Sequence, residues 1–333
     1  MKAMQPVPPV EGLKCTVIGA GGFIGSALCK LLCDKGASVR GLVRHIPPLL
    51  AEYPVSWVVG DYTDRSVLAR AIRRQDAIFH LVGGSIPEIS NRDPAADLMA
   101  NVLPVLGLLE LCQAEGVGKI LFPSSGGTVY GMTSVEPIVE SAPTNPISAY
   151  GISKLMIEKY LALYHHLHAL NFQILRISNP YGPGQSPDRR QGLVATVIHR
   201  ALTGQPVEIW GTGESVRDYI HVTDVANAFI YATHYRGPHR IMNVGSGQGL
   251  SINRVIDDIE NTLGNTEVFR QYQPGRAVDV PVNVLDISLM QRETGWRPEI
   301  AWIDGIRETV ALAMCRANRS SDGALAPLPA LRY

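Results

Sequence analysis

The glycine-rich stretch Gly19–Gly25 constrains the fold of this chain more than any other feature. It reads Gly-Ala-Gly-Gly-Phe-Ile-Gly, follows a short apolar run at Cys15–Ile18, and precedes an amphipathic segment that extends to Lys35. This order predicts a strand, a tight turn and a helix. In such a unit the glycine backbone approaches a pyrophosphate closely, and the first amides of the helix bind the anion. The context therefore predicts a dinucleotide site rather than a flexible turn.

Strand and helix signals continue to alternate beyond this turn. The predicted strands are Ser38–Val43, Val55–Val59, Ala77–Val82 and Lys119–Phe122, and the predicted helices are Ser66–Arg73 and Pro94–Ala114. Such alternation predicts an α/β fold with a doubly wound parallel sheet of the Rossmann type. Ligands of that fold bind at the carboxyl ends of the strands.

The regular alternation loosens near Pro180, where glycine, proline and charged residues become frequent. We therefore expect a Rossmann domain over 12–180 and a smaller C-terminal α/β substrate lobe over 181–317, with some strands of the second part returning to the first sheet. The last helix is predicted at Ile303–Ala317. The remaining residues, 318–333, are expected to form a flexible tail.

The composition excludes some classes of partner. Thirty basic and thirty acidic residues give a formal net charge of zero, whereas nucleic acid and anionic membranes require a clustered basic face. No apolar run approaches the roughly 20 residues that span a bilayer, so we expect a cytoplasmic protein with a small-molecule partner. The five cysteines are scattered and odd in number, which favours reduced thiols over a disulfide framework, and no metal site is expected.

The strand that ends at Val43 lacks an acidic residue that NAD sites usually carry. About 20 residues past the glycines, an Asp or Glu commonly accepts the hydroxyls of the adenosine ribose. Val43 and Arg44 occupy that place. Because a guanidinium can pair with the 2′-phosphate of NADP, these residues favour NADP. The alternative is that Arg44 is an ordinary solvated surface charge.

Tyr150 and Lys154 form a second motif, within Ala-Tyr-Gly-Ile-Ser-Lys from Ala149. On a helix, this spacing places both side chains on one face, about 6 Å apart along the axis. The ammonium can then favour the ionised phenol, so that a tyrosine with an ordinary pKa of about 10 becomes a proton acceptor near neutral pH. Alone the pattern is weak, because many amphipathic helices carry a packed tyrosine and a solvated lysine.

Five stretches of the chain occur in an order and spacing typical of one family. They are Gly-Ala-Gly-Gly-Phe-Ile-Gly from Gly19, Gly-Asp-Tyr-Thr-Asp from Gly60, Ser-Ser-Gly-Gly-Thr-Val-Tyr-Gly from Ser124, Tyr-Gly-Ile-Ser-Lys from Tyr150, and Arg-Ile-Ser-Asn-Pro-Tyr-Gly-Pro-Gly from Arg176. The chain thereby resembles the extended short-chain dehydrogenase/reductases, of the UDP-glucose 4-epimerase-like epimerase and dehydratase type. Further matches extend to Trp296.

The resemblance implies a mechanism with a bound nicotinamide cofactor, NAD in most of the family. Tyr150 takes the proton of a sugar hydroxyl as hydride leaves the same carbon, and Lys154 lowers the pKa of Tyr150 and holds the nicotinamide ribose. An epimerase returns the hydride to the other face of the 4-keto sugar, so no net redox change occurs.

The resemblance also assigns the binding residues. With Arg44, Tyr150 and Lys154, the cofactor is expected to contact Gly19, Gly22, Phe23, Ile24, Gly25, Asp61, Tyr62, Leu81, Val82, Gly83 and Asn101. The nucleotide diphosphate sugar is expected to contact Asn179, Leu193, Arg217, Arg276 and Asn283. The two arginines are expected to bind the diphosphate, because guanidinium donors fit phosphate oxygens.

One catalytic position departs from the family. A serine or threonine usually stands five residues before the glycine of the Tyr-Gly pair, and here Gly126 stands there. Thr128 and Ser125 both carry the required hydroxyl, and Thr128 is the preferred replacement, although both can also be structural hydroxyls of the loop. The Asp-Glu pair of the dehydratases is replaced by Gly127 and Thr128. Elimination of water therefore lacks its acid and base.

Two further expectations concern the substrate and the assembly. Asn283 occupies the family position that limits the substituent on the sugar 2-carbon, and its small size predicts tolerance of an N-acetyl group. Helices 94–114 and 149–169 are the pair that family members use in a dimeric bundle, so a homodimer is expected.

The leading interpretation is a 4-epimerase acting on a UDP-hexose or a UDP-N-acetylhexosamine. The alternatives are an NADP-dependent 4-keto-sugar reductase, a 4,6-dehydratase, and a cofactor-binding protein that has lost catalysis.

Overall fold

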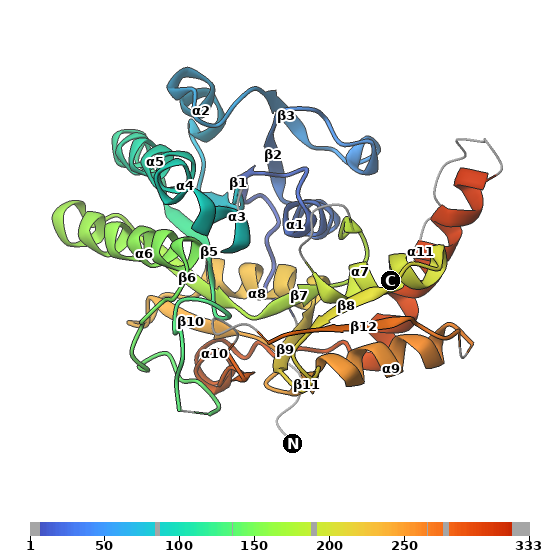
Figure 1. Ribbon diagram of the computed structural model, residues 1–333. Helices are drawn as coiled ribbons and strands as arrows, with labels where there is room; N and C mark the ends of the chain where they lie inside the picture. Colours follow the sequence, from blue (N-terminus) through green and yellow to red (C-terminus); the bar gives the residue numbers. More distant parts are fainter. Residues whose placement is uncertain are drawn as a thin grey trace.

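The computed structural model describes residues 7–83, 87–134, 136–187, 192–264, 266–275 and 280–321. A seven-stranded parallel sheet with the order β10-β6-β5-β4-β1-β2-β3 forms its centre (Figure 1). The strands are β1 Lys14–Ile18, β2 Ser38–Val43, β3 Ser56–Val59, β4 Ala77–His80, β5 Lys119–Ser125, β6 Phe172–Ile177 and β10 Ile241–Val244. The sheet confirms the predicted doubly wound α/β fold, and its first five strands coincide with the predicted ones to within a few residues.

Helices cover both faces of this sheet, as a doubly wound fold requires. One face packs against α1 (Phe23–Asp34) and α8 (Val222–His234), which lie side by side. The other packs against α2 (Arg65–Ile72), α5 (Leu103–Ala114) and α6 (Ala149–His168). The short helices η1 (Pro48–Leu50) and α3 (Pro87–Arg92) follow β2 and β4.

The helix predicted over Pro94–Ala114 is two helices, α4 (Pro94–Asn101) and α5 (Leu103–Ala114). Pro104 in the first turn of α5 explains the break, because a proline has no amide hydrogen to donate to Ala100. The hydroxyl of Tyr62 donates to the Ala100 carbonyl instead. In length and apolar character 94–114 would suit a membrane span, a criterion that core helices of soluble proteins also meet.

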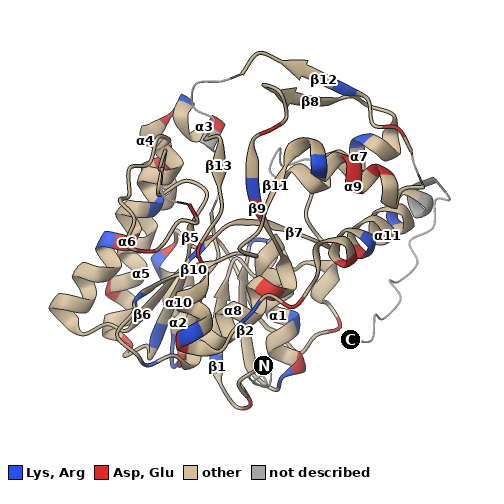
Figure 2. Cartoon of the chain, turned by 90° about the horizontal axis from the view of Figure 1, so that it is seen from below, with Lys and Arg blue, Asp and Glu red and all other residues tan. Residues whose placement is uncertain are grey.

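A second core forms beyond β6, where three helices pack around two small sheets (Figure 2). The sheets are β11 (Gly249–Ser251), β9 (Val216–His221), β13 (Val282–Asn283) and β7 (Asn179–Tyr181) in one, and β12 (Arg270–Gln273) and β8 (Val207–Trp210) in the other. The helices are α7 (Leu193–Thr203), α9 (Ile252–Thr262) and α11 (Trp302–Ser321), and α10 (Ser288–Thr294) packs on β10 of the first sheet.

The last helix is longer than expected. It runs from Trp302 to Ser321, so residues 318–321 of the expected tail are helical. No proline or glycine occurs between Gly305 and Gly323, and these are the residues that most often end a helix. The rest of the expected tail lies outside the described residues.

Candidate active site

The glycine turn joins β1 to α1 and packs against the end of β4. Gly19 has a φ of +88°, and a Cβ there would lie 3.0 Å from the carbonyl carbon of Leu81 and 3.1 Å from a methyl group of Val82. A Cβ at Gly25 would lie 2.2 Å from the Gly19 carbonyl oxygen. Only glycine fits these two positions. The turn therefore contacts Leu81 and Val82, which follow β4 and are expected at the cofactor. Phe23 and Ile24, also expected there, are the first two residues of α1.

The α1 N-terminus fits the pyrophosphate of a dinucleotide. Gly22 is its N-cap and supplies no side-chain hydrogen bond, so the first amides of the helix remain available to an anion. Gly83 extends this surface toward the expected catalytic lysine, because a Cβ at Gly83 would lie 3.7 Å from the Nζ of Lys154.

The adenosine end of the expected cofactor site lies where β2 and β3 end. Arg44 and Asp61 are exposed there. Hydrogen bonds from the amide and hydroxyl of Thr63, with a smaller contribution from the charge of Arg44, lower the pKa of Asp61. Arg44 and Asp61 thus place a cation and an anion at this edge. The hydroxyl of Tyr62, another residue expected at the cofactor, donates to the carbonyl oxygen of Ala100.

The N-terminus of α6 places Tyr150 and Lys154 on one face. The Ser148 hydroxyl caps the helix by accepting from the Gly151 amide at 3.2 Å. Lys154 Nζ donates to the carbonyl oxygen of Pro123 at 2.9 Å, and lies 5.7 Å from the centroid of the Tyr150 ring. The helix thereby holds the ammonium beside the phenol at the carboxyl end of β5.

The expected lowering of the Tyr150 pKa is not found in this arrangement. Burial, and after it the nearby carboxylate of Asp97, raise the pKa of Tyr150 to about 12. Burial lowers the pKa of Lys154 to about 8, although Asp97 and Glu158 oppose this shift. The attraction between the ammonium and the phenolate is therefore smaller than the cost of burying a charge at this position.

The loop after β5 is closely packed at Gly126, so a side chain there would require Leu285 to move. A Cβ there would lie 2.5 Å from Leu285 Cδ1. By contrast, the Thr128 hydroxyl oxygen is buried and has no hydrogen-bond partner among the described residues. Because buried hydroxyls are normally paired, this oxygen is available to a bound molecule. Ser125 is partly buried and ends β5, immediately before this loop.

A buried clamp behind this loop was not anticipated from the sequence. Glu158 accepts hydrogen bonds from the Ser124 hydroxyl at 2.5 Å and from Arg176 Nη2 at 2.6 Å. All three side chains are at most 4% exposed. A usable signal existed, because Glu158 follows Lys154 by four residues and so lies on the same face of α6.

Asp97 is a second buried carboxylate that sequence reasoning missed. It accepts from the Ser153 hydroxyl at 2.6 Å and from the Asn101 side-chain amide at 3.0 Å. Asn101, which was expected at the cofactor, thus has its amide bound to Asp97. Through Ser153, Asp97 also joins α4 to the face of α6 that carries Tyr150 and Lys154.

His80, at the end of β4, is a third missed residue. Its ring is 3% exposed and lies against Tyr62 and Phe122, at 5.9 Å from each ring centroid. Neither ring nitrogen has a partner among the described residues. Burial and the charge of Lys154 lower the pKa of His80 to about 3, so the ring is neutral.

A cavity of 280 Å³ opens in the second part of the chain. Three expected substrate residues line it, Asn179, Leu193 and Arg217, together with the aromatic Trp210 and Tyr219. Leu193 begins α7, whose N-cap Gly192 makes no side-chain hydrogen bond. A helix N-terminus and a guanidinium at one cavity suit a diphosphate.

One expected substrate residue, Asn283, is not among the residues that line this cavity. Asn283 is 1% exposed and donates from Nδ2 to the Gly126 carbonyl oxygen at 3.1 Å. Its Oδ1 is buried without a partner among the described residues. Asn283 pairs with Arg217 in the β13–β9 register, so it connects the cavity to the hydroxyl loop. Arg276 lies outside the described residues.

Comparison with known proteins gives consistent matches. The model of the NAD dependent epimerase/dehydratase family matches residues 15–245. A UDP-glucose 4-epimerase of Mycolicibacterium smegmatis is 32% identical over 306 residues, which cover 90% of this chain and 97% of that protein. A dTDP-4-dehydro-6-deoxyglucose reductase of Escherichia coli is 32% identical over 313 residues, with coverages of 90% and 97%. The crystal structure of a Thermus thermophilus UDP-glucose 4-epimerase in complex with NAD has a TM-score of 0.82 at 33% identity, and the match covers 90% of this chain and 98% of that one.

Proposed function

This chain belongs to the NAD dependent epimerase/dehydratase family, and on that basis we propose that it is a nucleotide-sugar 4-epimerase. One observation carries the proposal. Lys154 lies beside Tyr150 and is bound to Pro123, three residues before Gly126. The Gly126 carbonyl oxygen in turn accepts a hydrogen bond from the Asn283 side chain. Asn283 on β13 stands opposite Arg217 on β9, and Arg217 lines the cavity. An acid–base pair is thus connected to a site suited to a diphosphate.

Each residue has a definite part in the proposed reaction. The nicotinamide of the bound cofactor supplies the site that accepts hydride from the sugar 4-carbon and returns it. Tyr150 takes the proton of the 4-hydroxyl and gives it back once the 4-keto sugar has turned. Lys154 provides positive charge that stabilises the Tyr150 phenolate before it takes the proton and after it gives the proton back. The free hydroxyl of Thr128 donates to the sugar oxygen, with Ser125 as the alternative donor.

The family cofactor is NAD, and a preference for NADP is a second, finer proposal. Arg44 supports it, because this exposed guanidinium stands where NAD sites usually carry an acid. Asp61 beside it leaves a carboxylate for the ribose hydroxyls of NAD. Denaturing the purified protein and identifying the released dinucleotide by mass spectrometry tests the proposal, and release of NAD alone counts against a role for Arg44.

The proposed substrate is a UDP-hexose or a UDP-N-acetylhexosamine, and the proposed assembly is a cytoplasmic homodimer. Asn283 is smaller than an aromatic residue, which supports tolerance of the N-acetyl group. Leucines exposed on helices 94–114 and 149–169 support the dimer: Leu103 is 49% exposed, Leu163 44% and Leu167 59%. Sedimentation equilibrium would show a monomer if these leucines face water only.

The deciding experiment uses the purified protein without added cofactor. A panel of UDP-, GDP- and dTDP-sugars is incubated with it, and inversion at the 4-position is followed by proton NMR. Turnover that requires stoichiometric NADPH would favour the 4-keto reductase, a function supported by the similarity to the Escherichia coli reductase. Formation of a 4-keto-6-deoxy sugar would favour the dehydratase. If the wild-type protein converts none of these sugars and Tyr150→Phe still responds to ligand, the protein is a binding protein.

A further inference from the structure

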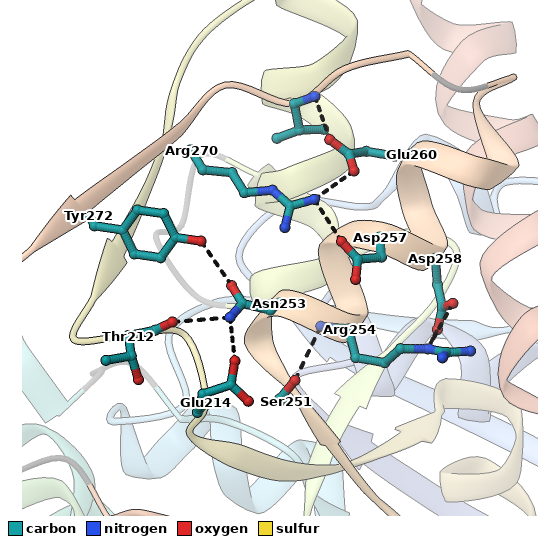
Figure 3. Close-up of polar contacts among 11 residues, drawn as sticks. Thr212, Glu214, Ser251, Asn253, Arg254, Asp257, Asp258, Glu260, Arg270 and Tyr272 are labelled. Atoms are coloured by element: carbon teal, nitrogen blue, oxygen red, sulfur yellow. Dashed lines mark hydrogen bonds and ion pairs between the residues drawn. The ribbon is translucent and has the colours of Figure 1, made fainter.

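Asn253 lies at the start of α9, and its side chain connects three segments of the second core (Figure 3). Its Nδ2 donates to the carbonyl oxygen of Thr212 at 3.0 Å and to a carboxylate oxygen of Glu214 at 2.6 Å. Its Oδ1 accepts from the hydroxyl of Tyr272 at 3.2 Å. One amide therefore joins α9, the turn 211–214 and strand β12.

The turn 211–214 lies between two residues that line the cavity. Trp210 ends β8 immediately before the turn, and Arg217 lies at the start of β9 just after it. Both side chains line the 280 Å³ cavity, whereas Asn253 does not. A shift of the turn would therefore change the separation of the aromatic and the cationic wall.

The turn fits closely around the Asn253 amide. Gly213 has a φ of +81°, and a Cβ there would lie 2.3 Å from Asn253 Oδ1. The backbone amide of Asn253 also donates to Gly213 O in the turn at 3.1 Å, and that of Ile252 donates to Ser215 O, just after the turn, at 3.3 Å. These backbone bonds survive a change of the Asn253 side chain, so a variant keeps α9 attached to the turn but loses the side-chain bonds that fix the turn's position.

We propose that Asn253 is a positioning residue for nucleotide binding: it holds the turn 211–214 so that Trp210 and Arg217 are correctly spaced for a nucleoside diphosphate. The proposal rests on the proposed function only in that the cavity takes such a molecule. An amide is the side chain suited to this task, because it donates to a carbonyl and a carboxylate while it accepts from a hydroxyl. An aspartate would lose both donors and repel Glu214.

The test measures binding and catalysis separately in the full chain. Titration calorimetry with UDP, GDP and dTDP gives the dissociation constants, and steady-state kinetics with the best sugar nucleotide gives KM and kcat. Asn253→Ala is expected to raise the Kd of the preferred nucleotide and the KM about tenfold, equivalent to about 1.4 kcal/mol. The value of kcat should stay within about twofold, because the Tyr150 site is unchanged. Asn253→Asp is expected to weaken binding at least as much.

Arg270→Met is the matched control. Arg270 binds Asp257 at 2.7 Å and Glu260 at 2.6 Å between the same helix and strand (Figure 3). No hydrogen bond or ion pair of Arg270 reaches the turn in the described part of the chain. Arg270→Met should therefore bind nucleotide as the wild type does, even if it is less stable.

The outcomes separate this proposal from the proposed function. Wild-type affinity in Asn253→Ala, or equal weakening in Arg270→Met, overturns the role of Asn253. A wild-type chain that binds UDP but inverts no sugar overturns the 4-epimerase function and leaves the role of Asn253 testable by Kd. A wild-type chain that binds none of the three nucleotides overturns both.

Discussion

The side-chain amide of Asn283 donates a hydrogen bond to the carbonyl oxygen of Gly126, 3.1 Å away across 157 residues of sequence. The position at which the resemblance places a catalytic hydroxyl is therefore in contact with the residue that it places near the sugar 2-substituent. Leu285 lies two residues beyond Asn283, and its side chain fills the space that a Cβ at Gly126 would need. The absence of a side chain at Gly126, where the resemblance places a hydroxyl, is thus tied to the packing of the segment that follows β13. We therefore expect the replacement hydroxyl from Thr128 or Ser125.

Restoring the family hydroxyl with Gly126→Ser should not improve catalysis. The new Cβ would lie 2.5 Å from Leu285 Cδ1, and overpacking of this kind costs about 1–3 kcal/mol of unfolding free energy. Urea denaturation and kcat measure the two effects. Gly127→Ser is the control, because the atom nearest to its Cβ would be 4.0 Å away. Faster turnover at unchanged stability in Gly126→Ser would show that the loop has room.

Thr128→Val should separate catalysis from stability. The Thr128 hydroxyl has no partner among the described residues, so its removal breaks no hydrogen bond of the folded chain. If it donates to the sugar oxygen, kcat should fall about 100-fold, as for other donors to a reacting oxygen. The melting temperature should stay within a few degrees. If Ser125→Ala instead causes the large loss and Thr128→Val does not, Ser125 is the catalytic hydroxyl.

The pH dependence of turnover should report on Lys154. Its pKa is lowered to about 8, so the ammonium is present below that pH and is lost as the pH rises through it. We expect kcat/KM to fall above about pH 8, because the phenolate of Tyr150, whose pKa is already raised to about 12 by burial, then has to form without the adjacent positive charge. In Lys154→Arg the guanidinium stays charged, and the decline should move to higher pH even if kcat is reduced. A decline at the same pH in both proteins would assign it to another group.

The central sheet could be predicted from sequence because most of its strands, the edge strand β3 excepted, are buried. Such strands appear as apolar runs, and Cys15–Ile18 and Ser38–Val43 match the observed strands closely. The predicted helix over 94–114 is wrong in one respect, because Pro104 divides it into α4 and α5. Tyr150 and Lys154 were found from helical spacing, which is a local property.

The electrostatics of the site depended on contacts that local spacing does not reveal. Asp97 raises the Tyr150 pKa from a different helix, and no sequence pattern connects the two. The contact between Asn283 and Gly126 forms only when β13 adds to β9. Long-range pairing of this kind is set by the packing of whole elements, so the sequence showed the groups of the site but not their partners.

The buried clamp under the catalytic loop gives the sharpest stability prediction. Glu158→Gln removes the negative charge opposite Arg176, and both side chains are at most 4% exposed. Leaving a buried guanidinium without its partner should lower the unfolding free energy by about 3–5 kcal/mol. Ser124→Ala removes only the bond from its hydroxyl to Glu158 and should cost about 1 kcal/mol. Denaturant unfolding of both variants measures the difference.

An exposed ion pair of similar geometry provides the control for this clamp. Arg65 and Glu110 lie 2.7 Å apart, but their side chains are 62% and 53% exposed, so Glu110→Gln should cost less than about 1 kcal/mol. Ser124→Ala should also lower kcat, because Ser124 precedes Ser125 at the end of β5 and the loop that carries Thr128 follows. Equal losses of stability in Glu158→Gln and Glu110→Gln would mean that water reaches the Arg176 site. Unchanged kcat in Ser124→Ala would mean that Lys154 and Pro123 hold the loop without the clamp.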